Sequence, residues 1–274
     1  MMRITSRQIP DIAAMLPPFP GVVPDLLETL NSELASIEAL VRIARTDTVI
    51  SAALLAAANG LCRLRAQPDI SDLFAAASLI GMVRLRQIIL NVGLNQFLGD
   101  VRGQAFVHRH SLGVAIVAQE LAGLCDLPTG EAYVAGILHD IGQLAYLVTD
   151  AEGYQALRQQ ALAQGDLIAR ERERYGLDHA QIGLLLASHW KLPPRILQAI
   201  NSHHDTGSAW RHKLQAVINL AETLAQALDL PYSPHNRVLT VNTAALDFLG
   251  LRWDMPEMQD LFERCRARFA IADA

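Results

Sequence analysis

The sequence predicts an all-α protein, and two observations carry that prediction. Apolar residues, mostly Ala and Leu, recur at helical spacings along nearly the whole chain, whereas the alternating runs typical of strands are almost absent. Hydrophobic residues make up 51% of the 274 residues and charged residues 19%. This composition supplies enough apolar material for a buried core and gives no sign of disorder.

The first part of the chain predicts a helical bundle. The Pro-rich segment LPPFPGVVP, residues 16–24, forms a rigid entry to it, and Gly60, Pro68 and Gly81 separate the helical patterns that follow. The expected helices cover residues 25–34, 36–45, 48–58, 71–80 and 82–97.

A second helical block opens near Gly103. Its expected helices cover residues 108–124, 130–147, 154–163, 179–190, 194–203 and 213–228, followed by shorter ones at 241–249 and 255–269. Because no long polar linker separates the blocks, we expect subdomains that share an interface. The predicted division is an N-terminal bundle at 1–102, a second bundle at 103–232 and C-terminal helices at 233–274, packed on the core.

Charge and cysteine content exclude several classes of protein. The net charge is −5, and only Lys191 and Lys213 among the 23 basic residues are lysines, so nothing favours a nucleic-acid polymer or a membrane surface as partner. The three cysteines are far apart and form no CxxC pair, which predicts buried apolar residues. The N-terminus lacks the apolar core of a signal peptide, and residues 73–83 are too short to span a membrane, so we expect a cytoplasmic protein.

The pair His139-Asp140 lies within the apolar stretch AYVAGILHDIGQLAYL, where we expect a continuous helix. A charged Asp in that setting is costly unless another group pairs with it. Two explanations are open at this point: a structural hydrogen-bonded pair, or a metal site that uses imidazole nitrogen and carboxylate oxygen.

Four further histidines favour the metal site. His110 precedes apolar residues at core-facing spacings, His179 opens a helix directly after a predicted N-cap at Asp178, and His203-His204 end another helix. Each alone is more typical of a capping or partly exposed histidine. Several helices that each direct a His or Asp to one bundle centre are, however, how helical bundles build metal sites.

These residues carry a family resemblance. The order of the histidines and Asp140 resembles the HD superfamily of metal-dependent phosphohydrolases, in particular its cyclic-dinucleotide phosphodiesterase branch, the HD-GYP enzymes. The segments LPPFPGVVPDLLETL, ARTDTVISAALLAAANG and ISDLFAAASLIGMVRLRQIIL resemble the N-terminal helices of the related HDOD family, a group of bacterial signalling modules. The resemblance spans residues 16–228 and implies an N-terminal helical bundle packed on an HD-like bundle.

The resemblance also implies a set of metal ligands. His108 is an alternative to the first of them, although the pair His110-Ser111 fits the pattern better. The pattern ends with an Asp on a later helix, where this chain has Glu222, whose longer side chain can still supply a carboxylate. The implied ligands are His110, His139, Asp140, His179, His203, His204 and Glu222, for one or two divalent ions. Without a thiolate, these donors suit Fe, Mn, Zn or Ni.

Two departures bear on catalysis. Active enzymes of this branch have HDIGK, whereas this chain has HDIGQ with the neutral Gln143, and the segment after the His pair, HHDTGSAW, lacks the GYP signature. Losing a cation beside a phosphodiester removes transition-state stabilisation of about 2–4 kcal/mol. The candidate substrate-binding residues are Gln143, Arg109 and Arg195, and the two arginines are candidates to replace the missing cation. If the site is active, His139 and Asp140 are its catalytic residues.

The sequence is therefore compatible with two specific functions and with a third, purely structural one. The favoured one is an HDOD regulatory module with an HD-type metal site and weak or no turnover, which binds a signalling protein or a nucleotide. The alternative is a metal-dependent phosphohydrolase that cleaves nucleotides or cyclic dinucleotides. The third is a helical scaffold with incidental histidines. Helical bundles with apolar faces commonly pair, so a homodimer is compatible with each of them.

Overall fold

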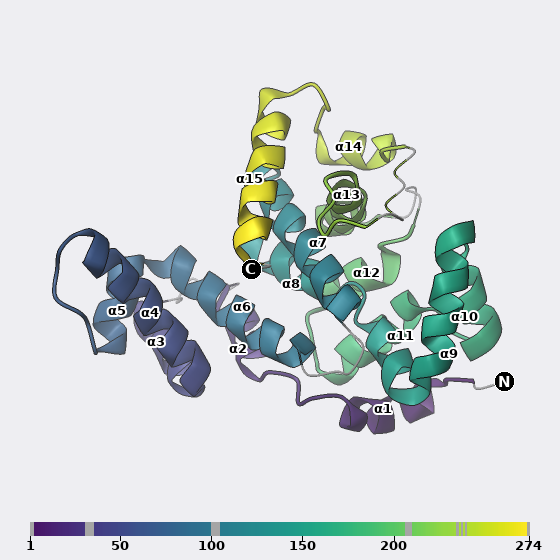
Figure 1. Ribbon diagram of the computed structural model, residues 1–274, viewed down its shortest axis with the longest axis horizontal. Helices are drawn as coiled ribbons and strands as arrows, with labels where there is room; N and C mark the ends of the chain where they lie inside the picture. The colour runs from purple at the N-terminus through teal and green to yellow at the C-terminus, as the bar shows by residue number, and fades with distance from the viewer. Residues whose placement is uncertain are drawn as a thin grey trace. The chain divides into compact units, whose positions relative to one another are not determined.

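The computed structural model describes residues 3–30, 36–99, 105–205, 210–233, 236, 238 and 240–272, and it confirms the all-α prediction (Figure 1). Within those ranges the regular structure consists of α-helices and one 3-10 helix, with no strand. The elements are η1 (Ser6–Gln8), α1 (Ile9–Met15), α2 (Val22–Leu30), α3 (Ile37–Arg45), α4 (Thr48–Leu64), α5 (Leu73–Ile80), α6 (Met82–Gly99), α7 (Ala105–Leu124), α8 (Thr129–Leu138), α9 (Gly142–Gln164), α10 (Leu167–Tyr175), α11 (His179–His189), α12 (Pro194–Ser202), α13 (Lys213–Ala227), α14 (Thr243–Leu249) and α15 (Pro256–Ala272).

The chain forms two compact units. One joins Met1–Pro18 to Gly99–Ala274, and the other is Phe19–Leu98. The segment that carries α1 therefore belongs with the later helices, and α1 packs against α9 and α11. The division at residues 102 and 232 expected from the sequence stays a prediction.

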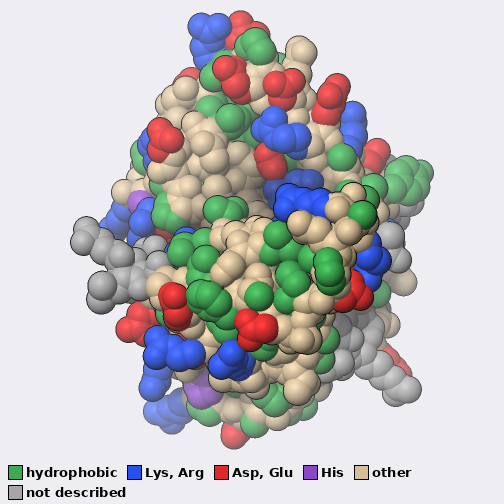
Figure 2. Space-filling view, turned by 90° about the vertical axis from the view of Figure 1, so that its left-hand side faces the viewer, with side chains coloured by type: hydrophobic (Ala, Val, Ile, Leu, Met, Phe, Trp, Pro, Cys, Tyr) green, Lys and Arg blue, Asp and Glu red, His purple; other side chains and the backbone are tan. Residues whose placement is uncertain are grey.

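The unit at Phe19–Leu98 contains α2 to α5 and nearly all of α6. Asn59 in α4 donates to the Ile70 carbonyl and accepts from the Ile70 amide, at 3.0 and 2.6 Å, which fixes the connection before α5. Phe19 and Phe97 pack edge to face with ring centroids 5.2 Å apart. Figure 2 shows exposed hydrophobic side chains interspersed with acidic and basic ones, and the large exposed apolar residues of this unit include Leu64 and Val83.

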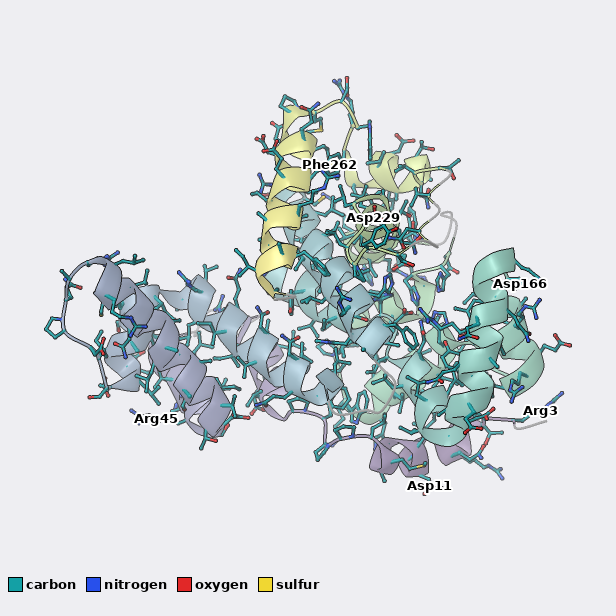
Figure 3. The ribbon with its side chains drawn as sticks, viewed as in Figure 1. Arg3, Asp11, Arg45, Asp166, Asp229 and Phe262 are labelled. Carbon is teal, nitrogen blue, oxygen red and sulfur yellow. The ribbon has the colours of Figure 1, made fainter. Side chains whose placement is uncertain are left out.

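The other unit is built around α7 and α8. Most of α8 is buried, and α7 packs against α8, α13 and α15. The backbones of α7 and α8 come close at Gly136, where an added Cβ would lie 2.7 Å from the Cα of Ala115. Side chains fill the space between the helices, while charged groups such as Asp11 lie on the outside (Figure 3). The three cysteines are buried and free, as expected.

The structure corrects the helix expected at residues 130–147. The helix is interrupted at His139, between α8 and α9, by two backbone hydrogen bonds of the i to i−3 type. The Ile141 amide donates to the Leu138 carbonyl at 3.0 Å, and the Gln143 amide donates to the Asp140 carbonyl at 2.9 Å. Apolar residues continue through the break, so hydrophobic periodicity could not reveal it. The His-Asp pair therefore lies at a junction of two helices and not inside one.

Two other helix predictions also differ from the structure, and two short helices were not predicted. Residues 154–163 belong to α9, which bends at Asp150, where the backbone leaves the helical region (φ −154°, ψ 59°). The short α1 and the highly charged α10 were not expected from the sequence. The helix expected at 25–34 is α2, which begins at Val22, and residues 31–35 lie outside the described ranges.

No single helix in the described part of the chain has the length and hydropathy to cross a membrane. Only α5 and α6 taken together satisfy that criterion, and they meet at a bend of 113°.

Candidate metal centre

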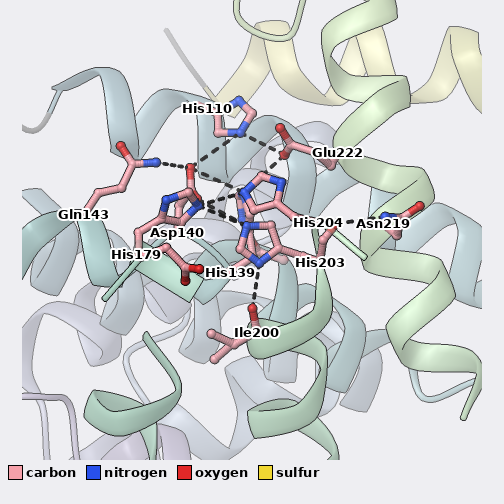
Figure 4. Close-up of polar contacts among 12 residues, drawn as sticks. His110, His139, Asp140, Gln143, His179, Ile200, His203, His204, Asn219 and Glu222 are labelled. Carbon is pink, nitrogen blue, oxygen red and sulfur yellow. Dashed lines mark hydrogen bonds and ion pairs between the residues drawn. The ribbon is translucent and has the colours of Figure 1, made fainter. Parts of the chain in front are cut away.

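The side chains predicted as metal ligands converge on one place in the helical unit (Figure 4). They come from α7, from the α8–α9 junction, from the first position of α11, from the end of α12 and from α13: His110, His139, Asp140, His179, His203, His204 and Glu222. Residues separated by more than a hundred positions in sequence thus meet at one polar cluster, which we call the His/Asp cluster.

Residues at the helix ends determine where α11 begins and where α12 begins and ends. The Asp178 carboxylate accepts from the Gln181 amide at 2.8 Å, and the Gln181 side chain accepts from the Asp178 amide, so α11 starts at His179 as the sequence predicts. Pro194 occupies the first turn of α12, and that helix ends with His203 as its C-cap. Gly183 allows α12 to come close, because an added Cβ would lie 2.9 Å from Ile200.

Asp140 lies at the centre of the cluster, and its two carboxylate oxygens face different histidines. Oδ1 is 3.1 Å from Nε2 of His179 and 3.6 Å from Nε2 of His203. Oδ2 is 3.5 Å from Nε2 of His139 and 3.8 Å from Nε2 of His110. One carboxylate thus belongs to two groups of donors, the arrangement expected of a ligand shared by two ions.

Each group contains a further donor. Glu222 Oε2 lies 2.9 Å from His110 Nε2 and 3.2 Å from His139 Nε2. His204 Nε2 lies 2.8 Å from His179 Nε2. Two ligands each about 2.1 Å from one ion lie roughly 3.0–3.4 Å apart at octahedral or tetrahedral angles, so the spacings in both groups suit a divalent metal.

Three imidazoles are oriented as metal-binding histidines usually are. Nδ1 of His139 lies 2.7 Å from the Gly136 carbonyl, Nδ1 of His203 lies 2.6 Å from the Ile200 carbonyl, and Nδ1 of His179 lies 2.7 Å from the Glu171 carboxylate. Each acceptor holds a ring proton on Nδ1, so that the neutral ring, the form that binds metal, directs its Nε2 lone pair into the cluster. His139 Nε2 is buried and lies 3.2 Å from Glu222 Oε2, but it forms no well-aligned hydrogen bond among the described residues. The residues present therefore fit a divalent metal.

The carboxylates of the cluster stay ionised, as metal binding requires. Burial acts to raise the pKa of Asp140, but the charges of His139 and His179 hold it well below its ordinary value. Burial likewise opposes ionisation of Glu222, but His110 and His139 hold its pKa well below the usual range. Without metal, ion pairs with these histidines keep both acids charged.

The predicted substrate-binding residues differ in their surroundings. Gln143 is buried and donates to Oδ2 of Asp140 at 2.6 Å, while its carbonyl oxygen has no hydrogen-bond partner among the described atoms. Arg195 forms an ion pair with Glu131 on α8 at 3.6 Å, which is not one of the cluster residues. Arg109 is exposed on α7, and His108 is half-buried beside it.

Sequence reasoning missed Glu171, a buried carboxylate in α10 that supports the cluster. It accepts from the backbone amide of His179 at 2.9 Å and from Tyr154 Oη at 3.0 Å, besides its contact with the His179 ring. A signal was present in the sequence: Ile168, Glu171 and Tyr175 follow one helical face, so an acid occupies an apolar stripe.

We predict that Glu171→Gln weakens metal binding about 10- to 100-fold. A neutral amide can still accept from the two N–H groups of His179, which share one Glu171 oxygen, but it lacks the negative charge that makes the His179 ring a more basic ligand. Glu173→Gln, an exposed position on the same helix, is the matched control and should bind metal like the parent protein. Titration calorimetry with Mn²⁺ measures both variants. Equal affinities for the two variants would show that Glu171 does not orient a ligand.

Comparisons with known proteins agree with the fold. The HDOD domain family matches residues 16–206 of this chain. An uncharacterised protein of Treponema pallidum (strain Nichols) is 21% identical over 194 residues. That match covers 69% of this chain but 38% of the relative, so the chain spans less than half of the relative's length.

Solved structures from three bacteria share the architecture. An HDOD domain protein of unknown function from Geobacter sulfurreducens has a TM-score of 0.71 at 23% identity, covering 96% of this chain and 88% of that one. A candidate phosphohydrolase from Shewanella amazonensis SB2B has a TM-score of 0.68 at 25% identity, covering 97% and 96%. A candidate signal transduction protein from Marinobacter aquaeolei VT8 has a TM-score of 0.76 at 18% identity, covering 100% and 63%.

Proposed function

Because the chain belongs to the HDOD domain family, we propose that it is a bacterial signalling module whose His/Asp cluster holds a pair of divalent metal ions, with weak or no turnover of phosphodiesters. The matched region contains every residue of the cluster except Glu222. A solved relative described as a candidate signal transduction protein supports the regulatory side of this proposal through its fold.

The main observation in favour of a metal site is the orientation of three imidazole rings, which hydrogen bonds at Nδ1 fix. His139, His179 and His203 each direct Nε2 toward Asp140, because a carbonyl or carboxylate occupies the Nδ1 side. At His139 the buried Nε2 lies 3.2 Å from a Glu222 oxygen without forming a well-aligned hydrogen bond, as expected where both atoms face a shared ion rather than each other.

The chain's own residues divide into two ligand groups that share Asp140. One group is His110, His139 and Glu222, and the other is His179, His203 and His204. Nitrogen and carboxylate donors without thiolate suit Fe, Mn, Zn or Ni. When bound, such ions supply Lewis-acid activation of a phosphoryl oxygen and of water.

Weak turnover is proposed because of Gln143. Its amide donates to Asp140, where the related enzymes carry a lysine. A neutral side chain at this position stabilises Asp140 but contributes no cation to a phosphodiester transition state.

A metal-dependent phosphohydrolase is the second candidate, favoured by the completeness of both ligand groups around Asp140. The two functions predict different rates of phosphodiester hydrolysis. We expect metal-loaded protein to hydrolyse bis(p-nitrophenyl) phosphate and cyclic dinucleotides no faster than about a few times the rate of Asp140→Ala protein, since a missing preorganised group costs about 10²–10³ in rate. Turnover far above that background, lost in Asp140→Ala, would establish the enzyme instead.

The partner we propose for the module is a signalling protein or a nucleotide, and a homodimer is compatible with the fold. Size-exclusion chromatography with light scattering determines the oligomeric state independently of metal content.

A further inference from the structure

Arg158 is a half-buried arginine of α9 with an uncommon environment. Its guanidinium carbon lies 3.4 Å from the centroid of the Phe106 ring, on α7. Among the described residues it makes no hydrogen bond or ion pair. The other arginines of this region differ: Arg170, Arg172 and Arg174 are each paired with an aspartate.

The neighbours of Arg158 place it beside the His/Asp cluster from two directions. Phe106, under the guanidinium, lies four residues before His110 on α7, about one helical turn away. On α9, Tyr154 lies one turn before Arg158 and donates to Glu171, the carboxylate that orients His179. The stacked guanidinium thus lies between helices that each supply or support a ligand of the cluster.

The charge of Arg158 acts on the cluster. Burial lowers the pKa of Arg158, while the charges of Tyr154 and Asp140 oppose that change. In turn the Arg158 charge acts to lower the pKa of His110. The Arg158 guanidinium and the His/Asp cluster therefore interact electrostatically. Among the described residues, no carboxylate is in direct contact with that guanidinium.

Stacking on Phe106 does not by itself account for this position. A cation over an aromatic ring is a weaker partner than a hydrogen-bonded anion, and the described residues accept none of the hydrogen bonds that the guanidinium can donate. Stacking does fix the plane of the guanidinium, so that its edge is preorganised for an oxyanion.

We propose that Arg158 binds a phosphate oxyanion of the ligand held at the His/Asp cluster, so that the ligand of this module is a phosphate or phosphate ester. This inference rests on the proposed metal site. The planar fork of arginine matches two oxygens of a phosphate, and divalent ions across the cluster favour the same anion. Gln143 is neutral and contributes no positive charge to phosphate binding. Arg158, farther along α9, supplies that charge.

The test is titration of inorganic phosphate into the Mn²⁺-loaded 274-residue chain, with metal content measured on each sample. Arg158→Ala is expected to raise the Kd for phosphate about 10- to 100-fold with unchanged metal content, and Arg158→Lys to restore part of the affinity. The matched control is Arg266→Ala, an exposed arginine of α15, which should leave the Kd unchanged.

The outcomes separate the two proposals. Metal-loaded parent and Arg158→Ala proteins with equal phosphate affinity would overturn the role of Arg158 while leaving the metal site intact. Parent protein that takes up no metal would overturn both. Lower melting temperatures for Arg158→Ala and Phe106→Leu with no change in phosphate affinity would mean that the pair only stabilises the fold.

Discussion

Replacing Asp140 by alanine is expected to abolish the stabilisation that divalent metal gives to this protein. A ligand present at about 100 times its Kd raises the free energy of unfolding by about 2.7 kcal/mol per site. Because Oδ1 and Oδ2 of Asp140 face different histidines, removing this one side chain damages both ligand groups. Differential scanning fluorimetry with and without Mn²⁺ measures the shift within each protein, so a change in the basal melting temperature does not obscure it.

Two single-group variants and one control sharpen this prediction. His110→Ala and His179→Ala each affect one group and should retain part of the shift, whereas Asp166→Ala, at an ion pair of α10 away from the cluster, should retain all of it. A full metal-induced shift in Asp140→Ala would refute the shared ligand.

Gly142→Ala is expected to lower the free energy of unfolding by about 3 kcal/mol or more, because overpacking against backbone leaves no side chain able to move aside. An added Cβ would lie 1.9 Å from the carbonyl oxygen of His179 and 2.8 Å from the amide nitrogen of Gly183. The start of α9 and the first turn of α11 would have to separate, and these elements carry Asp140 and His179. Urea denaturation followed by circular dichroism measures the loss.

Gly123→Ala is the matched control on α7. That residue is exposed, and its Cβ would meet only Thr129 Cγ2 at 4.0 Å, so stability should stay the same or rise slightly with the better helix former. Similar stability for Gly142→Ala and Gly123→Ala would contradict the close contact of α9 with α11.

Periodicity predicted the helical class, whereas the full set of candidate ligands was implied by the family resemblance and stays a prediction. Periodicity reports which face of a helix is buried, and polar residues such as His139 and Asp140 stand out against it. Caps report helix ends, which is why the start of α11 after Asp178 was predicted correctly.

Periodicity could not report what depends on tertiary contacts. The break at His139 interrupts no apolar pattern, and its tight turn is accompanied by a close approach of Gly142 to α11. Glu171 lies on an apolar stripe of a highly charged segment and Arg158 lies in a polar segment, and charged segments are ordinarily interpreted as solvated. Only the fold brings the first to His179 and the second over Phe106.

The central claim is that the His/Asp cluster holds two metal ions that share Asp140. Elemental mass spectrometry of the purified 274-residue chain, after reconstitution and removal of free metal, tests it most directly. The structure predicts about two ions per chain in the parent protein, about one in His179→Ala and none in Asp140→Ala. Parent protein that holds no metal after exposure to Fe, Mn, Zn and Ni would contradict the claim.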